Sequence, residues 1–311
     1  MRQLKGVPKT HIYRIIRSGE VRVNKGRVGA DTRLQSGDLV RLPPVRVSER
    51  VAEKEQAMTD FTLRGAPLRN FVVLHEDEHL IAIDKPAGVA VHGGSGVSFG
   101  VIEQLRMARP GAPFLELVHR LDRETSGILL VAKKRSALKN LQDQFRARQT
   151  GKTYLALVRG RWPAKLKVLD KPLHKFLVDG HDAQAGERRV KVVARDDPDG
   201  QPSVTLVKVR QASAEYSLLE VTIKTGRTHQ IRVHLASEGH PIVGDDKYGD
   251  FDLNKALARV NASPSLKRMF LHAWRLQFDH PASGERLELL ADLPPDLLQF
   301  SALALPLPLI T

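Results

Sequence analysis

The sequence predicts an α+β fold in which a small, basic N-terminal module precedes a larger body with a mixed or largely antiparallel sheet. The chain has 311 residues, enough for about two domains. Strand-length apolar runs follow one another after residue 70, and helical patterns separate only some of them. The net charge is +14, of which residues 1–50 carry +8. We therefore expect a basic module over residues 1–43, a linker over residues 44–69 and the larger body over residues 70–311.

The basic module is predicted to hold one helix and two short strands. Pro8 suits the first turn of a helix, and Gly19 can end it. Strands are expected at Val21–Val23 and Leu39–Leu42, with a turn at Asn24–Gly26. Between Pro8 and Gly19, apolar residues recur at helical spacing, namely Ile12, Ile15 and Ile16.

Positive charge gathers on this helix and directly after it, where it could neutralise the phosphates of a nucleic acid. The basic residues concerned are Lys9, Arg14, Arg17, Arg22, Lys25 and Arg27. A chain this basic is typical of a polyanion binder. Two alternatives stay open: a solvated basic helix without a ligand, and a mitochondrial transit peptide, because no acidic residue lies between Arg2 and Arg17.

The linker is charged and lacks clean periodicity. In the body, one amphipathic helix is expected at Ser136–Arg148, and the polar segment Asp179–Pro202 is expected to be an exposed excursion. The strands are predicted at Phe71–Leu74, Leu80–Ile83, Ile128–Ala132, Tyr154–Val158 and Tyr216–Ile223.

Composition excludes several classes of site. The absence of cysteine removes disulfides, thiolate zinc sites, iron–sulfur clusters and cysteine nucleophiles, and it is compatible with a reducing compartment such as the cytoplasm. No apolar run approaches the roughly 18 residues that a membrane span needs. His229 and His234 are five residues apart, not the four of a helical zinc pair, so no metal is expected. The glycines at Gly93–Gly96 lack the Gly-Lys-Ser/Thr of a phosphate-binding loop and indicate a turn.

The strongest chemical signal is the segment His119–Gly127, which precedes a buried strand. Asp122 lies between Arg120 and Arg123, and neighbouring cations favour the ionised form of a carboxylate. An ionised carboxylate at a strand edge in a basic protein is a candidate nucleophile or base. A surface ion-pair cluster at a turn is the alternative, and spacing alone favours it.

Longer stretches carry a family resemblance. "HRLDRETSGILLVAKK" resembles the catalytic motif of the RluA-type family of pseudouridine synthases, and three further stretches resemble motifs of that family and stand in its order, one before this motif and two after it. They are "IAIDKPAGVAVHGG" (Ile81–Gly94), "GKTYLALVRG" (Gly151–Gly160) and "TGRTHQIRVHLASEGHPIVGDDKYG" (Thr225–Gly249). The segment Leu4–Pro43 is similar to an S4 RNA-binding domain that is truncated at its start. The resemblance thus implies a pseudouridine synthase catalytic domain preceded by an S4-like domain.

The resemblance implies a cofactor-free isomerase that cleaves the glycosidic bond of a uridine, turns the uracil and joins C5 to C1′. It makes Asp122 the catalytic aspartate, Tyr154 the active-site tyrosine and Arg232 the arginine that pairs with Asp122. Arg120 matches the arginine that helps to extrude the nucleotide, and Ile231 matches the apolar residue beside the base.

Three more residues receive supporting predictions. Arg227 is the second candidate for the arginine that pairs with the aspartate. His119 and Thr125 are expected to support the loop around Asp122.

The finer resemblance implies a monomeric cytoplasmic enzyme whose partner is large-subunit ribosomal RNA, acting near the peptidyl-transferase centre. Two alternatives are a non-catalytic ribosome assembly factor that binds this RNA and a synthase of the same family with another RNA target. A glycoside hydrolase would need two catalytic carboxylates, and Glu124 is the only acidic residue near Asp122.

Overall fold

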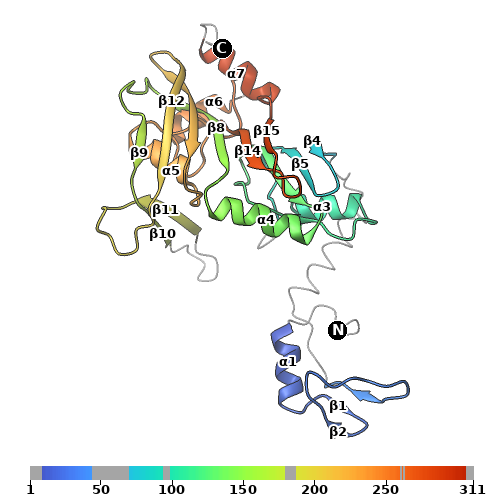
Figure 1. The fold of residues 1–311 in the computed structure, drawn as a ribbon. Helices are drawn as coiled ribbons and strands as arrows, with labels where there is room; N and C mark the ends of the chain where they lie inside the picture. The colour runs from blue at the N-terminus through green and yellow to red at the C-terminus, as the bar shows by residue number, and fades with distance from the viewer. Residues whose placement is uncertain are drawn as a thin grey trace. The chain divides into compact units, whose positions relative to one another are not determined.

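The protein divides into two compact units, residues 1–67 and residues 68–311. The computed structural model describes residues 9–43, 70–93, 99–178, 187–259, 261 and 263–305 (Figure 1). The predicted linker, residues 44–69, lies outside these described residues. Within them, every helix is too short or too polar to cross a membrane.

The first unit contains one helix and a small antiparallel sheet. Ile12 and Ile15 of the helix are buried together with Val21, as the helical spacing predicts. Asn24 and Lys25 both have positive φ, at 49° and 68°, which suits the tight turn of a hairpin. The elements are α1 (Lys9–Arg17) and the strands β1 (Arg22–Val23), β2 (Gly26–Arg27) and β3 (Val40–Arg41) in the order β2-β1-β3. The predicted helix and strands are therefore confirmed, and assignment to the S4 family stays a prediction.

The second unit is built on a ten-stranded sheet. Its strands follow the order β4-β5-β7-β14-β8-β13-β12-β9, with β15 beside β14 and β6 beside β7. Within the described residues every pairing in this sheet is antiparallel except that of β7 with β14, so the sheet is mixed, as predicted. The bounds are β4 (Val72–Glu76), β5 (Leu80–Lys85), β6 (Glu116–Leu117), β7 (Ser126–Ala132), β8 (Gly151–Arg159), β9 (Val168–Asp170), β12 (Val204–Ala212), β13 (Tyr216–Ile223), β14 (Leu271–Asp279) and β15 (Arg286–Leu290).

The parallel contact between β7 and β14 depends on Gly127. This residue has φ +110°, and a Cβ atom there would collide with the backbone carbonyl of Ala273. Only glycine therefore permits this close approach. All seven residues of β7 are buried, which explains why its sequence is a continuous apolar run rather than an alternating one. β7, which follows the loop that carries Asp122 in the sequence, is thus held firmly in the sheet.

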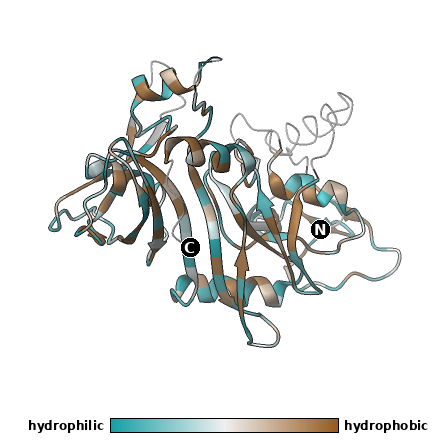
Figure 2. Cartoon of the chain, turned by 90° about the horizontal axis from the view of Figure 1, so that it is seen from above, coloured by the Kyte–Doolittle hydropathy of each residue, from teal (hydrophilic) through white to brown (hydrophobic). Residues whose placement is uncertain are grey.

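Helices cover the sheet and supply the rest of the core. The amphipathic helix that the sequence predicts is α4, whose buried residues include Ala137 and Leu141. It packs against β7 and β14 (Figure 1). Hydrophobic residues, brown in Figure 2, follow the strands of the sheet. The helices of this unit are α3 (Val101–Ala108), α4 (Arg135–Arg146), α5 (Gln230–Ser237), α6 (Phe251–Leu257) and α7 (Pro295–Ala304).

One expectation is wrong in part. The segment Asp179–Pro202, predicted to be an exposed excursion, contains the strand β11 (Glu187–Val192), which pairs antiparallel with β10 (Leu173–Val178). Val190 is buried against Val233 of α5. The alternation of valines with Arg189 and Lys191 is a strand pattern of period two, and the polar composition of the surrounding segment masks it.

Candidate active site

The loop between β6 and β7 carries Asp122 and is attached to the end of β5. The Thr125 N–H donates to the Asp122 carbonyl at 3.1 Å, which closes a turn. The next carbonyl, that of Arg123, accepts from the Gly88 N–H at 2.9 Å and from Lys85 Nζ at 3.1 Å. The backbone carbonyls of the catalytic candidate and of the residue after it are therefore held by hydrogen bonds.

Lys85 is fully buried, and sequence reasoning gave it no role. Its Nζ also donates to the carbonyls of Pro86 at 2.9 Å and Val89 at 2.8 Å, so three carbonyls match the three protons of an ammonium group. Burial lowers the pKa of Lys85 to about 7, and the nearby carboxylates of Glu124 and Asp122 oppose this shift. The signal in the sequence was a lysine at the end of a strand that begins with four apolar residues.

Two donors approach the same oxygen of the Asp122 carboxylate. Arg232 Nη1 lies 3.4 Å from Oδ2, and His229 Nε2 lies 3.9 Å from that oxygen. The aspartate side chain is 26% exposed, whereas that of Arg232 is 4% exposed. Within the described part of the chain no hydrogen bond reaches Oδ1. One oxygen is thus held by the protein, and the other is available to a ligand.

Arg232 is fixed by a second carboxylate that the sequence analysis did not single out. Its Nε and Nη2 donate to the two oxygens of Asp245 at 2.7 Å each, and Nη2 reaches Asp246 Oδ1 at 3.0 Å. Burial opposes the charge on the guanidinium, but the bonds to Asp245 and the charges of all three aspartates raise the pKa of Arg232 above its ordinary value. Arg232 is therefore a permanent cation with a fixed orientation.

Tyr154 and Ile231 lie close to these groups in the fold. Tyr154, on β8, packs against two hydrophobic core clusters. Burial and the negative charge of Asp122 raise the pKa of Tyr154, so its phenol stays protonated. Ile231, on α5, is buried in the hydrophobic core. Their predicted roles at the uracil stay predictions.

A cavity of about 440 Å³ opens beside Asp122. This volume falls within the range of pockets that hold small ligands. Arg120 is exposed at the cavity, and its side chain forms no hydrogen bond or ion pair within the described residues, so it is free to contact a ligand. The charged and titratable residues that line the cavity are His92, Arg120, Asp122, Arg123, Glu124, His229, Arg232, Asp246 and Lys247. Four cationic side chains and three carboxylates line this space, so the cavity is strongly polar.

His119 supports the loop, as expected. Its Nε2 accepts from the Leu130 N–H at 3.2 Å, and its ring stacks on Phe145 at a centroid distance of 4.8 Å. Burial lowers the pKa of His119 to about 4. Arg227 is exposed and donates to the Pro202 carbonyl at 3.3 Å, which directs its Nε away from Asp122.

The basic residues predicted to contact RNA lie on the surface of the first unit. Arg14 and Arg17 are exposed on α1, and Lys25 and Arg27 are exposed at the β1–β2 turn. Arg22 is half-buried and donates to the Lys25 carbonyl at 3.2 Å. The side chain of Lys9 lies outside the described part. The exposed cations are accessible to phosphates.

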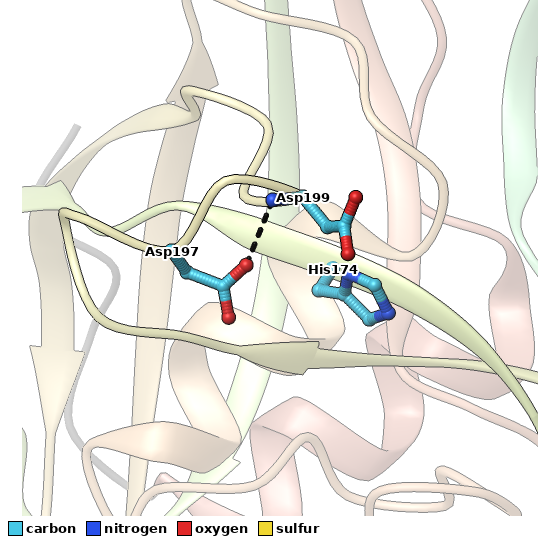
Figure 3. Close-up of side chains that lie close together, drawn as sticks. All are labelled: His174, Asp197 and Asp199. Carbon is cyan, nitrogen blue, oxygen red and sulfur yellow. Dashed lines mark hydrogen bonds between the residues drawn. The ribbon is translucent and has the colours of Figure 1, made fainter.

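One cluster has the spacing of metal ligands. Figure 3 shows His174 of β10 with Asp197 and Asp199 of the turn after β11, and their ligand atoms lie within 4.8 Å of one another. The Asp199 N–H donates to Asp197 Oδ1 at 2.9 Å, so part of this geometry belongs to the turn itself. None of the three residues lines the cavity at Asp122.

The comparisons with known proteins agree with one another. Residues 79–237, which include Asp122, Tyr154 and Arg232, match the family model described as RNA pseudouridylate synthase. "Ribosomal large subunit pseudouridine synthase C" of Escherichia coli (strain K12) is 51% identical over 291 residues, which cover 94% of this chain and 86% of that protein. The protein of that name in Haemophilus influenzae is 50% identical over 291 residues, covering 94% of this chain and 85% of its own length.

Solved structures give the same result. "Human RNA Pseudouridylate Synthase Domain Containing 4" has a TM-score of 0.61 and 28% identity, covering 83% of this chain and 99% of that one. "Human RNA Pseudouridylate Synthase Domain Containing 1" has a TM-score of 0.58 and 27% identity, covering 75% of this chain and 88% of that one.

Proposed function

Because the chain belongs to the RNA pseudouridylate synthase family, we propose that it converts specific uridines of large-subunit (23S) ribosomal RNA into pseudouridine. It is an isomerase, since the reaction rearranges one nucleotide. The N1–C1′ bond breaks and a C5–C1′ bond forms, while C5 loses a proton and N1 gains one. The observation that carries the proposal is Asp122, paired with Arg232 at the cavity and with Oδ1 open to a ligand.

The chemistry needs an ionised carboxylate next to a nucleotide that has left its helix. Arg232 supplies a fixed positive charge beside Asp122, with Nη1 3.4 Å from Oδ2. Arg120 offers a planar, charged fork for a phosphate or for the space that the nucleotide vacates. Tyr154 offers an aromatic ring on which the uracil can stack.

Identity of about 51% over 94% of the chain supports the large ribosomal subunit as the source of the substrate. The proposed targets are uridines near the peptidyl-transferase centre. The first unit, read as an S4-like domain, would bind the RNA through its exposed arginines and lysines. The proposed enzyme works in the cytoplasm as a monomer and without a cofactor.

The test is a map of pseudouridines in large-subunit ribosomal RNA from cells with and without this protein. We expect a small set of sites to disappear without it and to return when the wild-type chain is supplied. Supplying Asp122→Asn should leave those sites unmodified. An unchanged map would favour a non-catalytic assembly factor, whereas sites lost only from another RNA would indicate a family member with a different target.

A further inference from the structure

The hydroxyl of Tyr248 connects the β10–β11 hairpin to the active site. It accepts a hydrogen bond from the Val190 N–H of β11 at 3.0 Å, and it lies 2.8 Å from His229 Nδ1. A backbone N–H can only donate, so the phenol oxygen is the acceptor in the first bond. The phenol has one proton, and within the described residues His229 Nδ1 is the group that can accept it, so we assign Tyr248 as the donor to Nδ1.

This direction of the bond fixes the tautomer of His229. With Nδ1 as an acceptor, the proton of the neutral imidazole lies on Nε2. Nε2 faces Asp122, 3.9 Å from Oδ2, at the wall of the cavity. The imidazole is 14% exposed, and burial lowers the pKa of His229 while the charge of Asp122 opposes this shift. The ring thus presents an N–H, rather than a lone pair, to the aspartate.

The surrounding contacts hold His229 in an unusual backbone conformation. Its φ is +53°, in the left-handed region, directly before α5. Gln230 Oε1 fixes this turn by accepting from Thr225 Oγ1 at 2.7 Å and from the Arg227 N–H at 3.1 Å. The left-handed residue therefore persists because the turn around it is restrained.

Tyr248 also contacts the second cation at Asp122. The guanidinium carbon of Arg232 lies over the Tyr248 ring, 5.2 Å from its centroid. The Tyr248 N–H donates to Asp245 Oδ1 at 2.9 Å, the carboxylate that fixes Arg232. One tyrosine thus touches, through its hydroxyl, ring and backbone, both groups that approach Oδ2.

We propose that Tyr248 and His229 are positioning residues that, with Arg232, hold Oδ2 of Asp122 and leave Oδ1 as the oxygen that meets the nucleotide. The Val190 N–H of β11 holds the Tyr248 hydroxyl in place. The orientation of the Asp122 carboxylate therefore depends on the position of the β10–β11 hairpin. The inference rests on the proposed synthase activity. It predicts that changes at these residues lower the rate of the reaction and leave RNA affinity unchanged.

The first experiment separates rate from affinity. Tyr248→Phe removes the hydroxyl that bonds to Val190 and His229. The matched control for loss of a tyrosine hydroxyl is Tyr216→Phe, in the core at the start of β13. We expect Tyr248→Phe to lower the single-turnover rate at saturating RNA about tenfold or more, because small misplacements of reacting groups are costly. The RNA dissociation constant of Tyr248→Phe should stay within about twofold of the wild-type value, a free-energy difference of roughly 0.4 kcal/mol. The single-turnover rate of Tyr216→Phe should also stay within about twofold of wild type.

His229 is tested by rescue. His229→Ala should lose at least as much rate as Tyr248→Phe, while His229→Gln should recover part of it, because the amide offers an acceptor for Tyr248 and an N–H for Asp122. Should His229→Ala fail to fold, Tyr248→Phe still decides the matter. A single-turnover rate within about twofold of wild type for Tyr248→Phe would overturn the proposal, whatever the His229 variants show.

The second readout does not depend on activity. Nitrogen-15 NMR of labelled histidine distinguishes the two tautomers, and comparison with His229→Gln assigns the His229 signals among the 12 histidines. We expect the Nε2–H form in the wild type and a shift away from it in Tyr248→Phe. A wild-type Nδ1–H form would reject the inference, whereas a wild-type protein inactive on ribosomal RNA would reject the proposed function instead.

Discussion

Asp122 is restrained from one side only. Both neighbouring cationic or N–H-bearing side chains, Arg232 and His229, approach Oδ2, and the cavity opens beside the same carboxylate. The contacts to Oδ2 therefore orient the side chain, while Oδ1 stays open to a ligand. Under the proposed function, the charge of Asp122 serves catalysis, whereas exposed arginines and lysines serve RNA binding.

Replacing Asp122 by asparagine should consequently abolish pseudouridine formation and leave RNA affinity nearly intact. The change keeps the shape of the side chain but removes its negative charge, and the phosphate-binding cations are untouched. Turnover and binding are measured on isolated ribosomal RNA. Turnover within about tenfold of wild type, a barrier change of only about 1.4 kcal/mol, would contradict the catalytic assignment.

Lys85 gives a second prediction at the scale of one residue. Lys85→Met keeps the length of the side chain but leaves the buried carbonyls of Pro86, Val89 and Arg123 without Nζ. Each buried polar group left unsatisfied costs about 1–3 kcal/mol, so we expect at least about 2 kcal/mol less stability in urea unfolding. Single-turnover activity should fall too, because the Asp122 loop loses an anchor. The control is Lys139→Met on the exposed face of α4, and equal unfolding free energies for both variants would refute the anchor role.

At the scale of elements, β7 and β14 meet around a buried polar triad. His272 Nε2 donates to the Ala291 carbonyl at 2.9 Å, and its Nδ1 accepts from Ser126 Oγ at 2.8 Å. The Ser126 oxygen in turn accepts from Arg268 Nη2 at 2.6 Å. These bonds need a neutral imidazole, and burial lowers the pKa of His272 to about 4.

This pKa has a consequence for stability. The folded pKa lies below the unfolded value of about 6.5, so between these values the unfolded chain binds the extra proton. The contribution of His272 to the free energy of unfolding is fully present above pH 6.5. It is lost as the pH falls toward 4, by up to about 1.4 kcal/mol per pH unit. In urea unfolding from pH 7 to pH 4.5, His272→Gln should show a shallower decline than the wild type. Parallel pH curves would show that His272 does not titrate in this way.

The elements show where sequence reasoning succeeds. The helix α4 and the strand β7 were predicted because their apolar residues follow one local pattern each. Strand β11 was missed because its two valines alternate with charges inside a polar segment. Asp122, Tyr154 and Arg232 were selected through their motifs. Lys85, Asp245 and Tyr248 were not, because their importance depends on contacts across the fold, such as the 38-residue separation between Lys85 and Arg123.

At the scale of the whole molecule, charge and chemistry are divided along the chain. Residues 1–50 carry +8 of the net charge of +14, whereas the candidate catalytic residues all lie after residue 70. The two compact units follow the same division. Binding strength and turnover should therefore be separable by truncation.

Removal of residues 1–43 should weaken RNA binding and flatten its dependence on salt. For every phosphate that the truncated chain no longer neutralises, the slope of log affinity against log salt falls by roughly 0.7–0.9. The truncated chain should retain its sheet and some turnover on a short RNA at high concentration, because Asp122, Tyr154 and Arg232 remain. Titrations at several salt concentrations compare the two chains. Identical slopes would show that the first unit does not contribute to RNA binding.

The pairing of β7 with β14 also bears on how the protein folds. It joins Ser126 to His272, which lie 146 residues apart in the sequence. Contacts of such separation close late, because a long loop must lose its entropy before the pairing stabilises it. Asp122 lies in the loop that leads into β7, whereas Tyr154 lies on β8, which pairs with β14. A refolding chain should therefore form its hairpins early. Asp122 and Tyr154 should come together only when β7 pairs with β14.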